Sequence, residues 1–400
     1  PASAPVSSMP AISPTVDINN ALIEWFDRAM LRVDDMTPAA EAVAEKLLAG
    51  GCIYTAGNPG FGEEMFFRVG GFPFVKPWLG SGHTPGKDVF LYGRVTPNDP
   101  VSNYERFTTL MSGGRFKNNI TVAFTSKKWP QVSRVLDIIP TENHEKRVFL
   151  IDADVPFSGS IKDTCLSQVS AIALGWAFQG EVIAAVTRKG KMLATYSSEY
   201  EPPPLQTDDE VKDMIVNPNY AVEPVAPGVL GRAYLLACRT QLEQFKKDEA
   251  QNMSLAADRM IHCFNNGGLV WAVLHGHIHQ CATQVPPELP IMKFGREFDW
   301  EKYYQSKTPN GDLLFWIGYV EYPEKQTLGA LQSGCEVIAV SSREGQSRPG
   351  VINIRAPYDD IDACVTVPGY PLHILPTSGV VQSAIWYSMM AEIEQKLSAR

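Results

Sequence analysis

The sequence predicts an α/β protein made of two similar domains, each a parallel sheet with helices on both faces. The first observation is the stretch 50–71, where a Gly-Gly pair, a short apolar strand, a glycine-rich turn and a helix follow one another. The second is that residues 267–279 repeat this order about 217 residues later. The third is the alternation of short apolar strands with helices, which is typical of parallel sheets.

The composition is that of an ordinary globular chain. It has 400 residues, 44% hydrophobic and 20% charged, which is enough for two domains with their own cores. A net charge of −9 argues against nucleic acid and anionic membrane as partners. No apolar run in the sequence approaches the ~20 residues that cross a membrane. The seven cysteines include no Cys-x-x-Cys pair, which favours reduced thiols and a cytoplasmic location.

The first half begins with an arm, residues 1–16, that is rich in proline, alanine and serine and is expected to be flexible. Amphipathic helices are expected at 17–31 and 38–48, and Gly50 and Gly51 end the second one. The remaining elements expected in this half are a strand at 52–56, a helix from Glu63, a loop at 72–86, a strand at 88–93, a helix at 104–111, strands at 119–124 and 147–152, and a helix at 165–178 that ends at Gly180.

A proline-rich linker at 201–228 divides the chain into a first domain, 17–200, and a second, 229–400. The segment is too rich in proline for a helix and too long for a tight turn. The second domain is expected to contain helices at 230–251 and 255–261, strands at 269–274 and 312–318, a helix at 326–332, strands at 336–340 and 363–367, a loop at 370–379 and a helix at 380–397.

The turns that follow the two repeated strands are the candidate ligand site. Glycines such as Gly57 and Gly60 let the backbone approach a ligand closely, and Asn58 lies between them. The helix after this turn points its N-terminal N–H groups at the same place, which suits an anion such as phosphate. Gly276 takes the corresponding place in the second half. The glycine spacing does not match a dinucleotide-binding fingerprint.

Three histidines alternate in the second turn. His275, His277 and His279 would share one face of an extended strand. Three interpretations stay open: a metal site, a proton-transfer group, and an ordinary polar loop. Because no cysteine or carboxylate lies at ligand spacing nearby, no metal is expected.

These stretches resemble the SIS (sugar isomerase) family of phosphosugar isomerases and phosphosugar-binding proteins. Residues 50–71 are similar to a branch in which a GHSH-like turn leads into a helix of the form AEE-x-FYRAGG. Residues 276–279, GHIH, resemble that turn, and 359–381 resemble the family's C-terminal end. The resemblance covers roughly 20–195 and 230–397.

The resemblance implies a five-stranded parallel sheet in each half, in three αβα layers, and a ligand site that needs no cofactor. In the family a hydroxyl-rich loop, typically SxSGxT, holds the phosphate after a strand that here ends at Gly93 or Gly318. The loops of this chain depart from that pattern and keep only Thr96, Ser102 and Thr327 as candidate phosphate ligands.

The activity implied is that of a sugar-phosphate aldose–ketose isomerase. Glu63 or Glu64 would be the base that moves a proton between adjacent carbons, and His277 and His279 would assist. The two glutamates could equally well be helix-opening residues that the helix dipole favours.

Thr377 and Ser378, before the last helix, either cap that helix or reach the ligand. Two alternatives stay open for the whole chain: a phosphosugar-binding or regulatory protein without catalysis, and a scaffold that has lost the phosphate site. Assembly into a homo-oligomer through helices of the SIS type is also expected.

Overall fold

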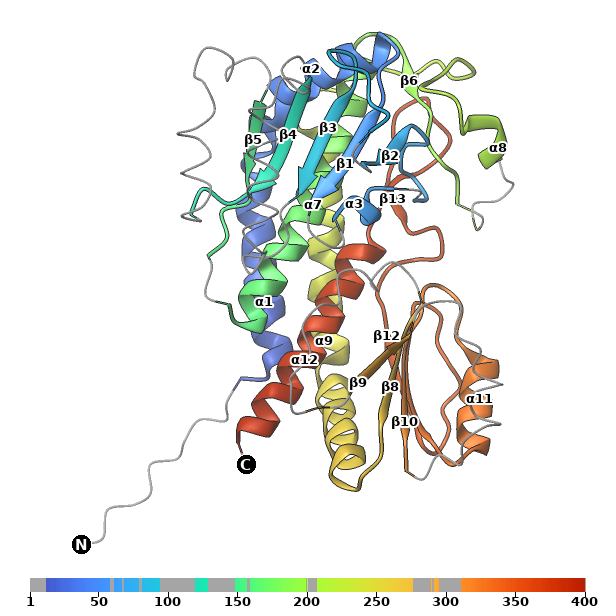
Figure 1. Ribbon diagram of the computed structural model, residues 1–400. Coiled ribbons are helices and arrows are strands. Elements are labelled where there is room, and N and C mark those ends of the chain that lie inside the picture. Colours follow the sequence, from blue (N-terminus) through green and yellow to red (C-terminus); the bar gives the residue numbers. More distant parts are fainter. Residues whose placement is uncertain are drawn as a thin grey trace, which may run out of the picture.

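Two parallel sheets, one in each half of the chain, define the architecture (Figure 1). The structure is a computed structural model that describes residues 12–57, 61–66, 68–78, 81–93, 119–128, 148–156, 159–198, 200, 207–275, 289, 291–294 and 311–399. Each sheet has five strands that are parallel throughout, in the orders β2-β1-β3-β4-β5 and β12-β11-β10-β8-β9. The predicted fold class is therefore confirmed.

The strands of the first sheet are β1 (Ile53–Gly57), β2 (Val75–Pro77), β3 (Val89–Gly93), β4 (Ile120–Thr125) and β5 (Val148–Asp152). The strands of the second are β8 (Val270–Leu274), β9 (Ile291–Phe294), β10 (Leu313–Ile317), β11 (Glu336–Ser341) and β12 (Val351–Arg355). Two small antiparallel pairs lie outside the sheets: β6 (Met192–Leu193) with β7 (Val216–Asn217), and β13 (Ala363–Val365) with β14 (Ile374–Pro376).

Four long helices form a bundle that joins the two sheets (Figure 1). They are α1 (Pro14–Met30), α7 (Ile161–Thr187), α9 (Val229–Asn265) and α12 (Ser378–Ser398). The shorter helices are η1 (Val33–Met36), α2 (Thr37–Leu48), α3 (Phe61–Glu64), α8 (Asp208–Val211) and α11 (Glu324–Gln332). A single apolar core runs from the first sheet through this bundle to the second sheet. The halves therefore share one core.

Helix α1 belongs to the first half but packs along α9 of the second. Ion pairs join Asp27 to Arg239 and Asp34 to Arg232, so the two helices run antiparallel. The buried face of α1, which includes Leu22 and Phe26, faces this bundle. Polar and charged residues occupy the outer face, as the helical periodicity predicted.

The glycine pairs behave as predicted at the ends of α2 and α9. Gly50 and Gly267 have φ angles of 83° and 78°, the left-handed conformation that terminates a helix at glycine. The next residue, Gly51 or Gly268, must be glycine because there is no room for a side chain. A Cβ on Gly51 would lie 2.4 Å from the carbonyl oxygen of Lys87, and one on Gly268 would lie 2.3 Å from that of Gly311.

An aspartate completes the same arrangement in each half. Asp88 Oδ1 accepts a hydrogen bond of 2.8 Å from the backbone N–H of Cys52. Asp312 Oδ1 accepts one of 2.8 Å from the N–H of Leu269. In both halves the contact ties the start of the repeated strand, β1 or β8, to the residue that precedes its neighbour in the sheet.

Several predicted boundaries are wrong, and Gly180 shows why. Helix α7 does not end at Gly180 but continues to Thr187. A Cβ on Gly180 would lie 3.3 Å from Leu230 Cβ and 3.4 Å from the N atom of Gly231. The glycine therefore lets α7 and α9 approach closely, and it does not stop the helix.

Other differences concern short or peripheral elements. The predicted loops 72–86 and 370–379 contain β2 and β14, and the linker region contains α8 and β7. Strand β12 was not predicted, and the helices expected at 230–251 and 255–261 are one continuous helix, α9. Strand β2 ends in Pro77 at the sheet edge, the position where proline is tolerated.

Among the described residues one helix, α7, is long and apolar enough by mean hydropathy to cross a membrane, although polar residues interrupt it and no apolar run in it reaches that length. All of its apolar window is buried inside the protein, so it is the central helix of the shared core.

We expect Gly51→Ala and Gly268→Ala each to destabilise the protein by about 1–3 kcal/mol, since the added methyl group meets a backbone carbonyl that cannot move aside. The measurement is the free energy of unfolding in urea. Gly329→Ala is the control, because a Cβ on this glycine of α11 has open space. Equal stability of all three variants would contradict the proposed packing constraint.

Candidate functional site

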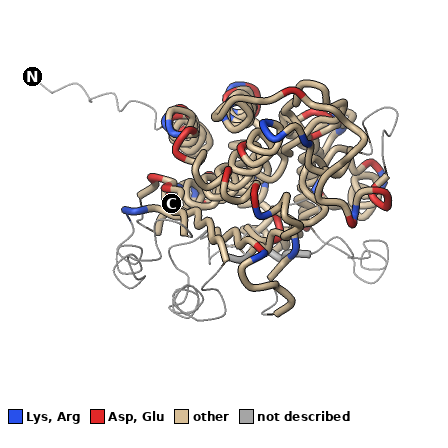
Figure 2. The backbone as a smooth tube through the Cα atoms, turned by 90° about the horizontal axis from the view of Figure 1, so that it is seen from above, with Lys and Arg blue, Asp and Glu red and all other residues tan. Residues whose placement is uncertain are grey.

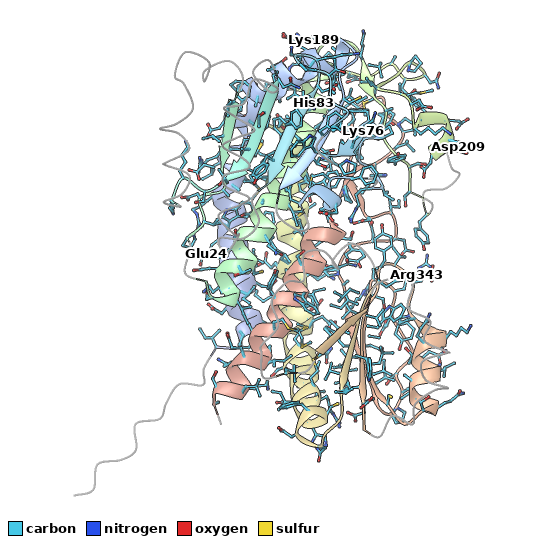
Figure 3. All side chains as sticks on the ribbon, in the orientation of Figure 1. Glu24, Lys76, His83, Lys189, Asp209 and Arg343 are labelled. Atoms are coloured by element: carbon cyan, nitrogen blue, oxygen red, sulfur yellow. The ribbon has the colours of Figure 1, made fainter. Side chains whose placement is uncertain are left out.

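The carboxyl ends of both sheets point toward the middle of the molecule (Figure 1). Open α/β sheets bind ligands beyond the carboxyl ends of their strands. Arg343, which follows β11, lies in this middle region (Figure 3). The candidate site therefore lies where α3, the turns after β10 and β11, and the start of α12 meet.

The two glutamates predicted as candidate bases, Glu63 and Glu64, both lie in helix α3 but differ in exposure. The helix is a single turn after β1, so adjacent residues point in different directions. Glu63 is exposed, whereas Glu64 is buried.

Glu64 and Arg68 form an ion pair that is closed off from solvent. Glu64 Oε2 lies 3.0 Å from Arg68 Nη1, and both side chains are at most 1% exposed. Trp176 Nε1 of α7 donates a hydrogen bond of 3.2 Å to Glu64 Oε1. A Cβ on Gly379 would lie 2.0 Å from Glu64 Oε1, so glycine is required for the carboxylate to lie against the first turn of α12.

Asp362 continues this network from the second half. Its carboxylate accepts hydrogen bonds from the N–H groups of Thr377 and Ser378 at 3.0 and 2.7 Å. It also accepts from the hydroxyls of Ser378 and Tyr319 at 2.7 and 3.0 Å. Arg68 Nη2 donates to Ser378 Oγ at 2.8 Å and lies 3.7 Å from Asp362 Oδ2. We call Glu64, Arg68, Asp362, Ser378 and Tyr319 the buried charge network.

Within the described residues, Arg68 Nε and Thr377 Oγ1 are buried polar atoms without a hydrogen-bond partner. Both residues are buried. Thr377 and Ser378 were predicted to cap α12 or to contact a ligand. In the structure Asp362 accepts from their backbone N–H groups, so a carboxylate from an earlier loop satisfies the start of this helix.

Burial and charge act in opposite directions within the network. Burial raises the pKa of Glu64, although Arg68 opposes the effect. Burial alone lowers the pKa of Arg68, but Glu64 and Asp362 outweigh it and raise that pKa. Burial, with the charge of Asp362, raises the pKa of Tyr319. One guanidinium thus faces two carboxylates, and the helix N-terminus of α12 supplies the remaining positive potential.

The predicted phosphate loop of the second half is occupied by its own side chains. Thr327 is fully buried, and its hydroxyl donates to Tyr322 Oη at 3.4 Å. The ring of Tyr322 lies against Gly345, where a Cβ would be 2.0 Å from it. The acidic residues of this loop are paired, Glu321 with Arg343 and Glu324 with Arg348.

In the first half an aromatic ring fills the end of β3. A Cβ on Gly93 would lie 2.0 Å from the ring of Phe61, which is buried beside Phe124 at a centroid distance of 5.4 Å. Gly57, predicted to contact the ligand, is the last residue of β1 and pairs in register with Gly93.

The remaining predicted site residues lie outside the described residues, namely Asn58, Gly60, Thr96, Ser102, Gly276, His277 and His279. His275 is described, and its ring stacks on Trp316 at 5.4 Å. Within the described ranges, no group of three or more His, Cys, Asp or Glu side chains could hold a metal ion.

The partners of Glu64 were harder to predict than Glu64 itself. Arg68 follows it by four residues, a spacing that brings side chains together on a helix, and this was the only available signal. Asp362, Tyr319 and Trp176 reach Glu64 and Arg68 only through the tertiary fold.

Comparison with known proteins identifies the type of fold. No family model and no curated protein matches the chain. A crystal structure from Silicibacter pomeroyi DSS-3, described as a "putative phosphosugar isomerase", matches with a TM-score of 0.54 and 10% identity, over 97% of this chain and 99% of that chain. The chain therefore has the fold of that protein over nearly its full length, and the fold implied by the SIS resemblance is confirmed.

Two further structures have lower scores. A "putative sugar binding protein" from Salmonella typhimurium LT2 has a TM-score of 0.48 at 11% identity, over 94% of this chain and 99% of that chain. The C-terminal domain of glucosamine-fructose-6-phosphate aminotransferase from Francisella tularensis has a TM-score of 0.46 at 10% identity, over 91% and 94%.

We expect Arg68→Met to destabilise the protein by about 3–5 kcal/mol, because it leaves two buried carboxylates without their cation. Arg259→Met is the matched control. It removes an exposed ion pair with Glu336 and should change stability by less than about 0.5 kcal/mol. Both are measured by urea unfolding at neutral pH. A loss for Arg68→Met as small as the control's would mean that the network is not stabilised by its arginine.

The raised pKa of Glu64 predicts a pH dependence of stability. The folded protein keeps the Glu64 proton to higher pH than the unfolded chain, whose glutamate pKa is about 4.3. The free energy of unfolding should therefore fall as pH rises from that value toward the raised pKa, by at most about 1.4 kcal/mol per unit.

Glu64→Gln removes this contribution, so the stability of the wild type relative to the variant should be greatest near pH 4.5 and decline toward pH 8. Urea unfolding across this range measures it. Parallel curves for the two proteins, or a wild type that gains on the variant with rising pH, would contradict the assignment.

Proposed function

We propose that the protein binds a phosphorylated sugar at the carboxyl ends of its strands and does not use Glu64 as a catalytic base. The fold it shares with a protein described as a putative phosphosugar isomerase supports the ligand class, by analogy of fold. The place follows from the general rule that open α/β sheets bind ligands beyond the carboxyl ends of their strands.

We exclude Glu64 as a base because the buried charge network is closed off from solvent. Both oxygens of Glu64 are engaged, one by Arg68 and one by Trp176, and the carboxylate lies against Gly379. A general base must come within hydrogen-bond reach of the proton that it removes. Glu64 would have to leave both partners to do so, and the cost of exposing Arg68 without it opposes that movement.

The second candidate is a sugar-phosphate aldose–ketose isomerase, and the raised pKa of Glu64 favours it. Buried carboxyl groups with perturbed pKa values are frequent in active sites. In this case binding would open the network, and Glu64 or the exposed Glu63 would move the proton, assisted by His277 and His279. The loop glycines, Thr96, Ser102 and Thr327 would then hold the phosphate.

The third candidate, a scaffold without a ligand, is favoured by the side chains that fill both loop regions. Phe61 covers Gly93 in the first half, and Tyr322 covers Gly345 in the second. A phosphate would have to displace the buried ring of Phe61 in the first half or the half-buried ring of Tyr322 in the second.

Other properties follow as parts of the same proposal. We infer a tandem duplication, because Gly51 with Asp88 and Gly268 with Asp312 make the same contacts. We also infer domains at 17–200 and 229–400, an arm at 1–16 and a linker at 201–228. A cytoplasmic location fits the six described cysteines, which are free thiols. Nucleic acid, membrane and metal are not expected as partners, whereas a homo-oligomer is.

The test is thermal unfolding of the full chain with a panel of hexose and hexosamine phosphates at millimolar concentration. A ligand that binds only the folded state raises the midpoint by mass action. We expect a shift of about 2–4 °C with at least one sugar phosphate and none with the unphosphorylated sugars. The Glu64→Gln variant should show the same shift relative to its own midpoint.

A coupled assay for aldose–ketose interconversion is run on both proteins. Turnover by the wild type that is lost in Glu64→Gln would replace the binding proposal with the isomerase. If no phosphate compound shifts the midpoint, both phosphosugar functions fail and the scaffold remains.

A further inference from the structure

A cavity of about 200 Å³ lies at the carboxyl end of β5, away from the buried charge network. Strand β5 is the edge strand of the first sheet, and β3 and β4 separate it from β1. The walls come from the end of α1, from η1, from Lys127 two residues after β4 and from residues 150–154. We call this cavity the edge pocket. Its place beyond strand ends is one where open α/β sheets bind ligands.

Three basic side chains line the edge pocket: Arg28, Arg32 and Lys127. Arg28 lies in the last turn of α1, and Arg32 follows one turn later. Within the described part of the chain, no hydrogen bond or ion pair engages the Nη groups of Arg28 or the ammonium group of Lys127. Basic and acidic residues are interspersed along the described part of the chain (Figure 2).

Three aspartates also line the edge pocket, and each has a partner. Asp35 Oδ2 lies 3.5 Å from Arg32 Nε. Asp152 Oδ1 accepts hydrogen bonds of 3.0 Å from the backbone N–H groups of Lys127 and Asp154. Asp154 Oδ1 contacts the ammonium group of Lys128 at 2.8 Å. The contacts from Arg28 to Asp154 and from Arg32 to Asp152 are 3.9 Å long, beyond hydrogen-bond distance. Within the described residues the Nη groups of both arginines make no hydrogen bond, so these donors remain for an anion although Arg32 Nε pairs with Asp35.

The floor of the edge pocket is apolar. Trp25 is buried, and its Nε1 donates a hydrogen bond of 2.6 Å to the carbonyl of Ala153, which fixes the indole ring. Ile151 and Leu174 extend this surface. Asp154 has a φ angle of 50°, a conformation that is uncommon outside glycine and that often occurs at ligand sites. The pocket thus combines a rim of three basic and three acidic side chains, in which donors of the basic residues remain unused, with an apolar base.

We propose that the edge pocket binds a small organic anion, in which a phosphate or carboxylate group is attached to an apolar or aromatic body. The anionic group contacts Arg28, Arg32 and Lys127, and the body lies against Trp25. Arginine suits both anions because its guanidinium group binds them in a bidentate manner. This site is independent of the proposed phosphosugar function, because it lies at another strand and uses other residues.

Isothermal titration calorimetry on the full chain tests the proposal, with phenyl phosphate, benzoate and inorganic phosphate as probes. We expect phenyl phosphate or benzoate to bind with a Kd near or below about 1 mM, and inorganic phosphate to bind at least about tenfold more weakly for lack of an apolar body. The stronger of the two organic probes identifies the preferred anion. Failure of both to bind at 10-fold higher concentration, about 10 mM, overturns the proposal.

The variant is the double change Arg28→Gln and Arg32→Gln, which should weaken binding at least about tenfold. Both arginines are about half exposed, so the variant should fold, and its circular dichroism spectrum and unfolding midpoint verify this. The matched control, Arg259→Gln, changes an exposed arginine of α9 and should leave binding unchanged. Equal affinity of the double variant and the wild type overturns the proposal.

The same variant separates the edge pocket from the proposed phosphosugar site. Midpoint shifts caused by sugar phosphates should persist in the double variant, and sugar phosphates should not compete with phenyl phosphate. Loss of both kinds of binding in the double variant would mean that the edge pocket is the sugar site, which overturns its independence. If the wild type binds phenyl phosphate or benzoate but no sugar phosphate, the phosphosugar proposal fails and the edge-pocket proposal stands.

Discussion

The interior of this protein depends on buried carboxylates that satisfy the N-termini of helices belonging to other elements. Glu392 of α12 accepts from the N–H of Thr15 at 3.0 Å, at the start of α1. Glu181 of α7 accepts from Gly228 and Gly231 at 2.6 and 2.9 Å, at the start of α9. Asp362 does the same for α12. The first N–H groups of a helix have no partner within it, so a buried helix start requires such an acceptor.

These contacts explain why the four long helices form one bundle and not two separate layers. Glu392 ties α12 to the start of α1, and Glu181 ties α7 to the start of α9, in addition to the apolar packing between these helices. The buried charge network belongs to the same system, since Asp362 satisfies α12 and Arg68 joins Asp362 to Glu64. A buried polar network destabilises the folded state when one of its members lacks a partner. The position of Glu64 is therefore maintained by the fold, whatever ligand the protein binds.

The sequence was informative where a local pattern has a local cause. Gly50 and Gly267 end helices because only glycine adopts their backbone angles readily, and the strands after them are apolar because both faces are covered. Edge strands such as β2 gave no such signal, because three residues show no periodicity. Gly180 was misinterpreted because close helix packing and helix termination both favour glycine. Arg68 and Ser378 are 310 residues apart, and no pattern within either segment indicates that they meet.

The position of α1 has a consequence for how the chain is made. Its apolar face, with Leu22 and Phe26, packs against helices of the second half, of which the first, α9, begins only at Val229. A ribosome adds residues at ~5–20 per second, so this face waits on the order of 10–40 s for its partner. During that time the nascent first half carries an uncovered apolar helix, which is the kind of surface that chaperones bind. The order of synthesis thus leaves α1, and α7 beside it, incompletely packed until α9 and α12 of the second half have been made.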